Sequence, residues 1–216
     1  MIEVAFTDVA LSLGDGAGAE VRAAALAQVA EATGAVPRLM HQVHGAGVDV
    51  VDAGGEEPPT CDAMVTATPR VALLARAADC VPVLLADPAT GWIAAVHCGR
   101  PGLVAGVVPA AVARIRASGG DPTVAWVGPH VCGACYEVPS DLQHQVAGIV
   151  PESRSTTSWG TPALDLGAGV RAQLAAAGID DVRAVDTCTR EDGSWPSYRR
   201  DHDAATRFAG VVWSHP

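Results

Sequence analysis

The chain has 216 residues, with 24 acidic and 14 basic side chains and a formal net charge of −10. Hydrophobic residues make up 49% and charged residues 18%, which excludes a disordered chain and allows a packed core. All the basic side chains are arginines, and the acidic excess argues against a nucleic-acid partner, whose phosphate backbone would need a basic surface. The length predicts a single domain over residues 1–216.

The chain contains no run of 18 apolar residues, so we expect no membrane span. Its first 15 residues carry acids where a signal peptide needs bases, which favours a cytoplasmic location. Six cysteines in such a reducing compartment are expected to be core thiols, metal ligands or catalytic groups and not a disulfide framework.

Short apolar runs and Ala-rich segments alternate along the chain and predict strands and helices. In the first half, a helix is expected at 20–32 and strands at 48–51, 63–67, 71–77, 81–86 and 92–96, the last two joined by a hairpin turn at 87–91. In the second half, helices are expected at 103–117, at 140–150 with a Ser-Asp cap, and at 164–177, with strands at 124–127, 182–185 and 208–213. Loops marked by Gly and Pro are expected at 54–59, 118–122 and 151–162. The predicted fold class is therefore α/β (α+β), a single compact domain with a mixed β-sheet and packed helices.

Three short segments at the ends of predicted strands hold most of the reactive side chains. They are His41-Gln42-Val43-His44-Gly45, Ala78-Asp79-Cys80-Val81-Pro82 and Ala95-Val96-His97-Cys98-Gly99. If the strands are neighbours, Cys80 and His97 can face the same cleft. Two imidazoles, from His44 and His97, and the thiolate of Cys80 suit Zn²⁺ or copper with one position open to substrate. The alternative is that the histidines are ordinary sheet-edge residues and Cys80 is a small buried hydrophobe.

A second metal-binding pattern is Cys132-Gly133-Ala134-Cys135, a C-x-x-C preceded by His130. A structural zinc site normally has a second such pair, and the sequence shows none. The favoured interpretation is that the two cysteines simply line a loop that follows Gly128-Pro129.

The densest polar cluster is Ser197-Tyr198-Arg199-Arg200, and two further arginines lie nearby in the sequence, Arg190 and Arg207. Pairs of arginines bind phosphate or carboxylate through bidentate hydrogen bonds. The alternative is a solvated charged loop. The sequence contains no phosphate-binding Walker loop, dinucleotide-binding motif or serine-hydrolase elbow.

Taken together, these segments resemble the YfiH family, also described as DUF152 or the polyphenol oxidase/laccase-domain group. The matching stretches are 39–45, 61–66, 78–87, 94–99, 127–129, 136–138, 164–166, 188–189 and 197–200. Each stretch is short, but together they follow the family's order from about residue 39 to the C-terminus.

The resemblance implies that the metal ligands are His44, Cys80 and His97. It also implies a compact YfiH-like fold, a monomer or weak homodimer, and phosphorolysis of adenosine, inosine, guanosine and methylthioadenosine. Some adenosine deamination is implied as well, and some bacterial relatives are named peptidoglycan editing factors. The partners are then a purine nucleoside and phosphate, and the cofactor is Zn²⁺, with Cu²⁺ as the other candidate.

Roles for the remaining polar residues follow from the chemistry of phosphorolysis, which needs a held phosphate and a neutralised leaving purine. Phosphate is expected on Arg199 or Arg200. For Asp79 we expect that it orients a ligand or acts as a base, with a structural role behind the ligands as the equal alternative. The expected substrate-binding residues are Ser197, Tyr198 and Arg100.

The chain departs from the family at two places. The family usually reads His-Ala-Gly-Trp-Arg-Gly where this chain reads His97-Cys98-Gly99-Arg100-Pro101-Gly102, so the Trp is lost and Arg100 is displaced. Residues 1–38 are expected to be shortened, and an Arg of that region is missing. These changes put the substrate more in doubt than the metal ligands.

Three other functions stay open. Cys80 and His97 suit a metal-free cysteine amidohydrolase acting on an amide such as a cell-wall precursor. A copper-dependent phenol oxidase is disfavoured, because the seven histidines include no His-x-His pair. The contracted N-terminus also allows a regulator that keeps the fold with weak activity.

Overall fold

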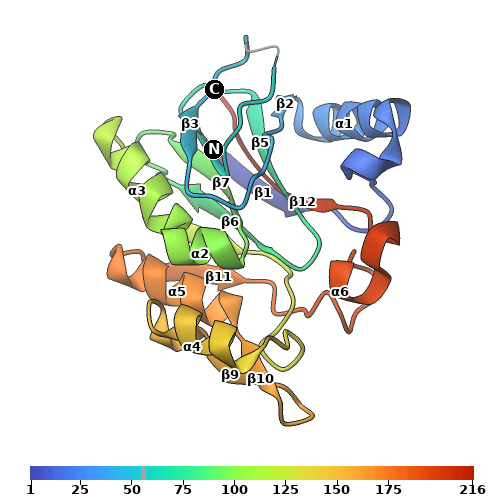
Figure 1. Ribbon diagram of the computed structural model, residues 1–216. Coiled ribbons are helices and arrows are strands. Elements are labelled where there is room, and N and C mark those ends of the chain that lie inside the picture. Colours follow the sequence, from blue (N-terminus) through green and yellow to red (C-terminus); the bar gives the residue numbers. More distant parts are fainter. Residues whose placement is uncertain (55–56) are drawn as a thin grey trace.

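The computed structural model describes residues 1–54 and 57–216, and its strands form two large sheets and one hairpin (Figure 1). The four-stranded sheet has the order β1 (Ile2–Phe6), β12 (Phe208–Ser214), β5 (Val71–Ala77) and β2 (Val36–Arg38). The six-stranded sheet has the order β11 (Asp181–Ala184), β8 (Val124–Val127), β6 (Val81–Ala86), β7 (Ile93–Cys98), β4 (Ala63–Thr66) and β3 (Val48–Val50). Each contains parallel and antiparallel pairs, which confirms the predicted mixed α/β class, although with two sheets where one was expected.

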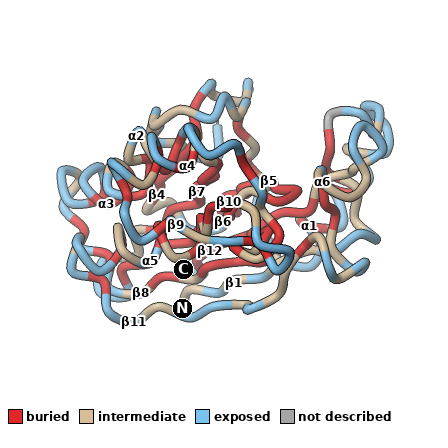
Figure 2. Tube along the Cα trace, turned by 60° about the horizontal axis from the view of Figure 1, so that its bottom comes forward, coloured by how far each residue is buried: buried red, intermediate tan, exposed pale blue. Residues whose placement is uncertain are grey.

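The central strands of both sheets are buried on both faces, as the red segments in Figure 2 show. In β7, Ile93 and Ala95 pack in the apolar layer between the sheets, whereas Ala94 and Val96 pack in the layer under the helices. This alternation follows from the two-residue period of a strand. Because both faces are covered, these strands are apolar throughout, which is why they can be found in the sequence as uninterrupted apolar runs.

Helices cover the two outer faces, so the layers run helix, sheet, sheet, helix (Figure 1). Helix α1 (Ala19–Thr33) packs on the four-stranded sheet, and the six-stranded sheet is covered by α2 (Arg100–Ala105), α3 (Val107–Ala117) and α5 (Leu166–Ala176). The remaining elements are α4 (Ser140–Ala147), the hairpin of β9 (Arg154–Thr156) and β10 (Pro162–Leu164), α6 (Tyr198–Asp201), and 3₁₀ turns at Asp15–Ala17, Pro151–Ser153 and His202–Ala204.

Most predicted elements are confirmed within a few residues, with three corrections. The helix expected at 103–117 is two helices, because Gly106 between them adopts a φ of +77° and starts a new axis. The N-cap of α4 is Pro139, and Ser140 makes no capping bond, whereas Asp165 does cap α5. Strands β1, β2, β9 and β10 and helix α6 were not predicted. Part of the loop expected at 54–59, residues 55–56, lies outside the described residues.

No helix within the described ranges has the length and apolar character needed to cross a membrane.

Candidate active site and metal centre

The candidate site lies where the chain crosses from one sheet to the other. Strand β5 of the four-stranded sheet ends at Ala77, and β6 of the six-stranded sheet begins at Val81. The short link between them carries Asp79, whose φ of +87° lets the chain reverse, and Cys80. A cavity of about 690 Å³ opens over this link, so the reactive side chains of the link face a space large enough for a small-molecule ligand.

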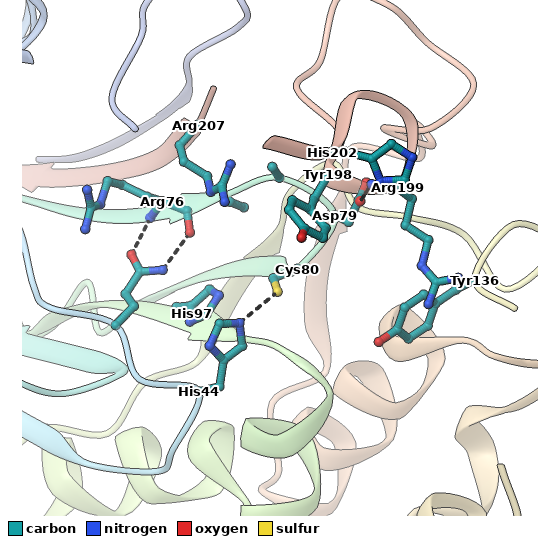
Figure 3. Close-up of a pocket in the computed structure, with 13 residues that line it drawn as sticks. His44, Arg76, Asp79, Cys80, His97, Tyr136, Tyr198, Arg199, His202 and Arg207 are labelled. Atoms are coloured by element: carbon teal, nitrogen blue, oxygen red, sulfur yellow. Dashed lines mark hydrogen bonds between the residues drawn. The ribbon is translucent and has the colours of Figure 1, made fainter. Parts of the chain in front are cut away.

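His44, Cys80 and His97 converge at the floor of this cavity (Figure 3). The Cys80 sulfur lies 3.7 Å from Nε2 of His44, and the two imidazole rings stand edge to face with centroids 4.7 Å apart. One ligand atom from each of the three residues lies within 4.8 Å of the other two. Segments that are far apart in the sequence therefore present three potential ligands to one point.

The carboxylate of Asp62, at the start of β4, holds two of these ligands in place. Its Oδ1 accepts hydrogen bonds from Nδ1 of His97 and from the backbone N–H of His44, both at 2.9 Å. Its Oδ2 accepts from the backbone of Gly45 at 2.6 Å. Because Nδ1 of His97 is engaged, its Nε2 is directed to the site, the usual arrangement of a carboxylate behind a metal-binding histidine. Asp62 was not among the site residues predicted from the sequence.

Gly99, directly after β7, allows the ligands to approach one another. A Cβ at this position would lie 2.5 Å from a ring carbon of His44 and 3.1 Å from the Cys80 sulfur. Its backbone φ of −82° is open to any residue, so the requirement for glycine here is one of space. The loop with His44 is fixed further by Gln42, whose side chain exchanges two hydrogen bonds with the backbone of Arg76 (Figure 3).

The electrostatics favour an ionised thiol in the metal-free protein. Burial alone would raise the pKa of Cys80, but the charges and hydrogen bonds of His97 and His44 lower it to about 6. Burial would likewise lower the pKa of His97, but Cys80 and Asp62 raise it to about 9. The pair is therefore a thiolate beside an imidazolium at neutral pH, and a bound cation would take the place of the imidazolium proton.

This donor set fits a zinc ion. Two imidazole nitrogens and one thiolate, ordered by Asp62 around a space that Gly99 leaves clear, are ligands typical of catalytic zinc with one position left for substrate.

Asp79 supports the site and also ties it to helix α6. Its Oδ1 accepts from the hydroxyl of Thr189 at 2.7 Å, and its Oδ2 accepts from the backbone N–H of Arg199 at 2.6 Å. Both carboxylate oxygens are thus used to hold the segment that leads into α6. This favours a positioning role for Asp79 over the role of a base.

The other wall of the cavity carries aromatic and basic side chains. Arg199 donates to the carbonyl of Glu137 at 2.7 Å and lies over the ring of Tyr136, 4.3 Å from its centroid. Burial raises the pKa of the Tyr136 phenol, and the charge of Arg199 opposes that rise. Figure 3 shows Tyr198 and Arg207 facing the same space. Gln42, Arg76 and His202 also line it, and the sequence analysis had not singled them out.

Three of the predicted site residues do not line the cavity. Arg200 donates to the carbonyls of Thr189 and Trp195 and to the carboxylate of Asp201, so of the two arginines expected to hold phosphate only Arg199 lines the cavity. Ser197 is fully buried, where it caps α6 by accepting from the backbone of Arg200. Arg100 is the first residue of α2 and does not line the cavity, although its charge, like that of Arg199, opposes the rise in the pKa of Tyr136.

We expect alkylation of Cys80 in metal-free protein to follow a pKa near 6. Because the pKa is lowered, the thiolate is already the main form at pH 7, and the iodoacetamide rate should fall only below about pH 6. A cysteine peptide added as a reference, with a thiol pKa of about 8.5, should still gain about tenfold per pH unit between pH 6 and 8. Peptide mass spectrometry follows both thiols in one sample. A Cys80 rate that climbs steadily to pH 9 would contradict the thiolate–imidazolium pair.

Asp62→Asn should weaken zinc binding by about 10- to 100-fold while the chain stays folded, because His97 loses the charge that orients it. Competition with a chromophoric chelator measures this affinity. Asp87→Asn is a matched control, since Asp87 is also buried and hydrogen-bonded, but in the β6–β7 turn outside the cavity. Equal zinc affinity in Asp62→Asn and the wild-type protein would mean that Asp62 does not support the ligands.

The chain resembles known proteins in both sequence and fold. The family model described as multi-copper polyphenol oxidoreductase laccase matches residues 4–215. A purine nucleoside phosphorylase of Streptomyces coelicolor is 55% identical over 178 residues, which are 81% of this chain and 73% of that protein. The structure of a Neisseria meningitidis protein of the DUF152 family matches with a TM-score of 0.83 at 27% identity. The match covers 100% of this chain and 95% of the Neisseria chain. The Bacillus licheniformis protein YfiH has a TM-score of 0.86 at 22% identity, covering 99% and 92%.

Proposed function

The chain belongs to the laccase-type family that is also described as DUF152 and YfiH, and we propose that it is a zinc-dependent purine nucleoside phosphorylase. The observation that carries the proposal is one cavity with a histidine–cysteine–histidine triad at its floor and Arg199 on its wall. Support comes from relatives that are named for this activity. The candidate substrates are adenosine, inosine, guanosine and methylthioadenosine, together with inorganic phosphate.

In phosphorolysis, a phosphate oxygen forms a bond to C1′ of the ribose as the bond from C1′ to the purine nitrogen breaks. The purine leaves with the bonding electron pair and takes up a proton, and the sugar leaves as its 1-phosphate. The enzyme must hold the phosphate dianion next to C1′ and neutralise the purine as it departs.

The residues around the cavity suit these tasks. Arg199 is the candidate phosphate ligand, because its guanidinium faces the cavity and is held by Tyr136 and the Glu137 carbonyl. Tyr198 offers a ring on which a purine can stack. Asp79 fixes Arg199 relative to Cys80 through its backbone hydrogen bond, so phosphate and triad keep a constant separation.

A zinc ion held by His44, Cys80 and His97 would supply a Lewis acid that polarises an oxygen atom next to it. With water in place of phosphate, the same site could support the expected deamination of adenosine, in which water adds to the purine carbon and ammonia leaves. We propose zinc, with copper as the other candidate, because two imidazoles and a thiolate suit both ions.

A second candidate, a metal-free cysteine amidohydrolase, is favoured by one observation. Cys80 has a lowered pKa and His97 lies against it, as a nucleophile and its base require. In that case a chelator would leave activity intact, whereas alkylation of Cys80 would abolish it.

A cytoplasmic location and a monomeric or weakly dimeric state stay predictions of the sequence.

The test is a panel of the four nucleosides with and without phosphate, read by chromatography as free base and sugar 1-phosphate. We expect free base to form only with phosphate, to stop after zinc removal and to return with added zinc. Free base that forms equally without phosphate would indicate hydrolysis. No release from any nucleoside by the zinc-loaded protein would overturn the proposal and favour a regulator with this fold.

A further inference from the structure

Three cysteines and a glutamate gather at a second place, outside the cavity. Ligand atoms of Cys132, Cys135, Cys188 and Glu191 all lie within 4.8 Å of one another. The Cys135 sulfur lies 3.3 Å from Oε1 of Glu191. None of these four residues lines the cavity described above, and the proposed phosphorolysis uses none of them.

The four residues come from two turns that have the same backbone pattern. In the first turn, the N–H groups of Cys135 and Tyr136 both donate to the carbonyl of Cys132, at 3.0 Å each. In the second turn, Glu191 and Asp192 donate to the carbonyl of Cys188, at 3.2 and 3.0 Å. The second pair that a zinc site requires is therefore present, as C-x-x-E in place of C-x-x-C. The sequence pattern alone did not reveal it.

Backbone contacts hold the two turns against each other. His130 and Cys188 form an isolated parallel β-bridge, and the N–H of Thr189 donates to the His130 carbonyl at 3.1 Å. The backbone N–H of Cys132 points at the Cys188 sulfur, 3.4 Å away. Such N–H groups stabilise a thiolate. The donor atoms are therefore brought together by the fold itself.

The first turn has little freedom to move away from the second. A Cβ on Gly133, between the two cysteines, would lie 2.6 Å from the Ser155 hydroxyl and 2.8 Å from Cβ of Asp165. The turn is thus pressed against the β9 strand and the start of α5. Cys135 is buried, whereas Cys132 and Cys188 are half-buried and Glu191 is exposed, so an ion can enter from the side of Glu191.

We propose that Cys132, Cys135, Cys188 and Glu191 bind a second zinc ion in a closed, structural site. Three thiolates and a carboxylate complete a tetrahedron with no position left for substrate. Ideal zinc geometry places two sulfur ligands about 3.8 Å apart and a sulfur and an oxygen about 3.5 Å apart. The observed separations need only small side-chain movements to reach these values.

The second zinc would stabilise the position of the segment that leads into α6 and carries Arg199. Thr189, next to Cys188, donates to Asp79 in the β5–β6 link, and its carbonyl accepts from Arg200 at 2.6 Å. The Cys188–Glu191 turn therefore sits at the base of the chain leading into α6. In the terms of the proposed function, this zinc stabilises the phosphate-binding wall and takes no part in the chemistry.

Metal analysis by mass spectrometry of reduced, dialysed protein tests the proposal without any activity assay. We expect about two zinc equivalents per chain in the wild type, about one in Cys80→Ala, and about one in Cys135→Ser/Cys188→Ser. The combined triple variant should hold none. Cys61→Ala is the matched control, since Cys61 is buried outside both clusters, and it should keep about two.

Glu191→Ala tests the site even if the double variant Cys135→Ser/Cys188→Ser does not fold, because it keeps all three thiols and changes an exposed residue. On the Cys80→Ala background it should lose zinc to a chelator at least about tenfold faster, at unchanged circular dichroism. Cobalt added to Cys80→Ala should give intense thiolate-to-metal absorption that Cys135→Ser/Cys188→Ser removes. A zinc content unaffected by Cys135→Ser/Cys188→Ser would overturn the proposal, as would a Cys132–Cys188 disulfide in freshly purified protein. Failure of phosphorolysis would leave these metal counts unchanged, so the two proposals fail separately.

Discussion

Replacing Cys80 with alanine is expected to abolish phosphorolysis and empty the ligand triad while the protein stays folded. Cys80 supplies the only thiolate of the triad and lies on the link where the chain passes between the sheets. Two imidazoles alone hold zinc far more weakly than two imidazoles and a thiolate. We expect turnover to fall by about 10³-fold or more, the scale of losing a main electrostatic element of an active site.

The measurement combines zinc content with the nucleoside assay, on the Cys135→Ser/Cys188→Ser background so that zinc at the second cluster does not mask the loss. Cys98→Ala is the matched control, because Cys98 is the residue after His97 but packs into the layer under the helices. It should keep zinc at the triad and most of its activity. Zinc retained at the triad by Cys80→Ala would refute the ligand assignment, and activity retained without zinc would refute the role of the metal.

Replacing Arg199 with alanine is expected to raise KM for phosphate by about 10- to 100-fold, the value of a lost charge-assisted hydrogen bond. Zinc content should not change, because Arg199 is not a ligand. Arg199→Lys should recover part of the loss, since it restores the charge without the planar fork. The measurement is initial rate against phosphate concentration at saturating nucleoside.

Two other arginines sharpen this test. Arg200→Ala removes bonds to the carbonyls of Thr189 and Trp195, so it should lower the free energy of unfolding without a specific effect on KM for phosphate. Arg183→Ala, on the outer strand β11, should change neither quantity. A larger rise in KM from Arg200→Ala than from Arg199→Ala, in folded protein, would reverse our assignment of the phosphate ligand.

The convergence of His44, Cys80 and His97 could be anticipated from the sequence, because their segments flank apolar runs and the family resemblance implied the same three residues. Asp62, whose carboxylate orders two of these residues, could not be predicted. Asp62 lies 35 residues from His97, and their hydrogen bond exists only because β4 and β7 are neighbours in the sheet. Local patterns carry no information about such pairing, so a single carboxylate next to a cysteine gave no signal.

The same limit applies to the fold. Strands that are buried on both faces appear as apolar runs and were found, but the division into two sheets depends on long-range pairs. Strand β1 at the N-terminus pairs with β12 at the C-terminus, which places Ile2 opposite Ser214. Neither strand indicates its partner through composition, and β1, with alternate residues exposed, is not an apolar run.

Arg199 and Arg200 show why charge clusters are hard to interpret from sequence. The two residues are adjacent and chemically identical, but consecutive positions on a helix point in directions about 100° apart. Arg199 therefore lines the cavity, whereas Arg200 turns back to the carbonyls of the preceding loop. The cluster around Cys132 and Cys135 could not be seen in the sequence for a related reason, because Cys188 lies 56 residues from Cys132 and the cluster's fourth member is Glu191 and not a cysteine.

A zinc-edge anomalous difference map, from crystals of protein purified without added metal, is the direct test of whether His44, Cys80 and His97 bind zinc. We expect a peak about 2.0–2.3 Å from the nitrogen ligands of His44 and His97 and from the Cys80 sulfur. A map with no peak between these three side chains, or with density only at the cysteine cluster of Cys132, Cys135 and Cys188, would contradict it.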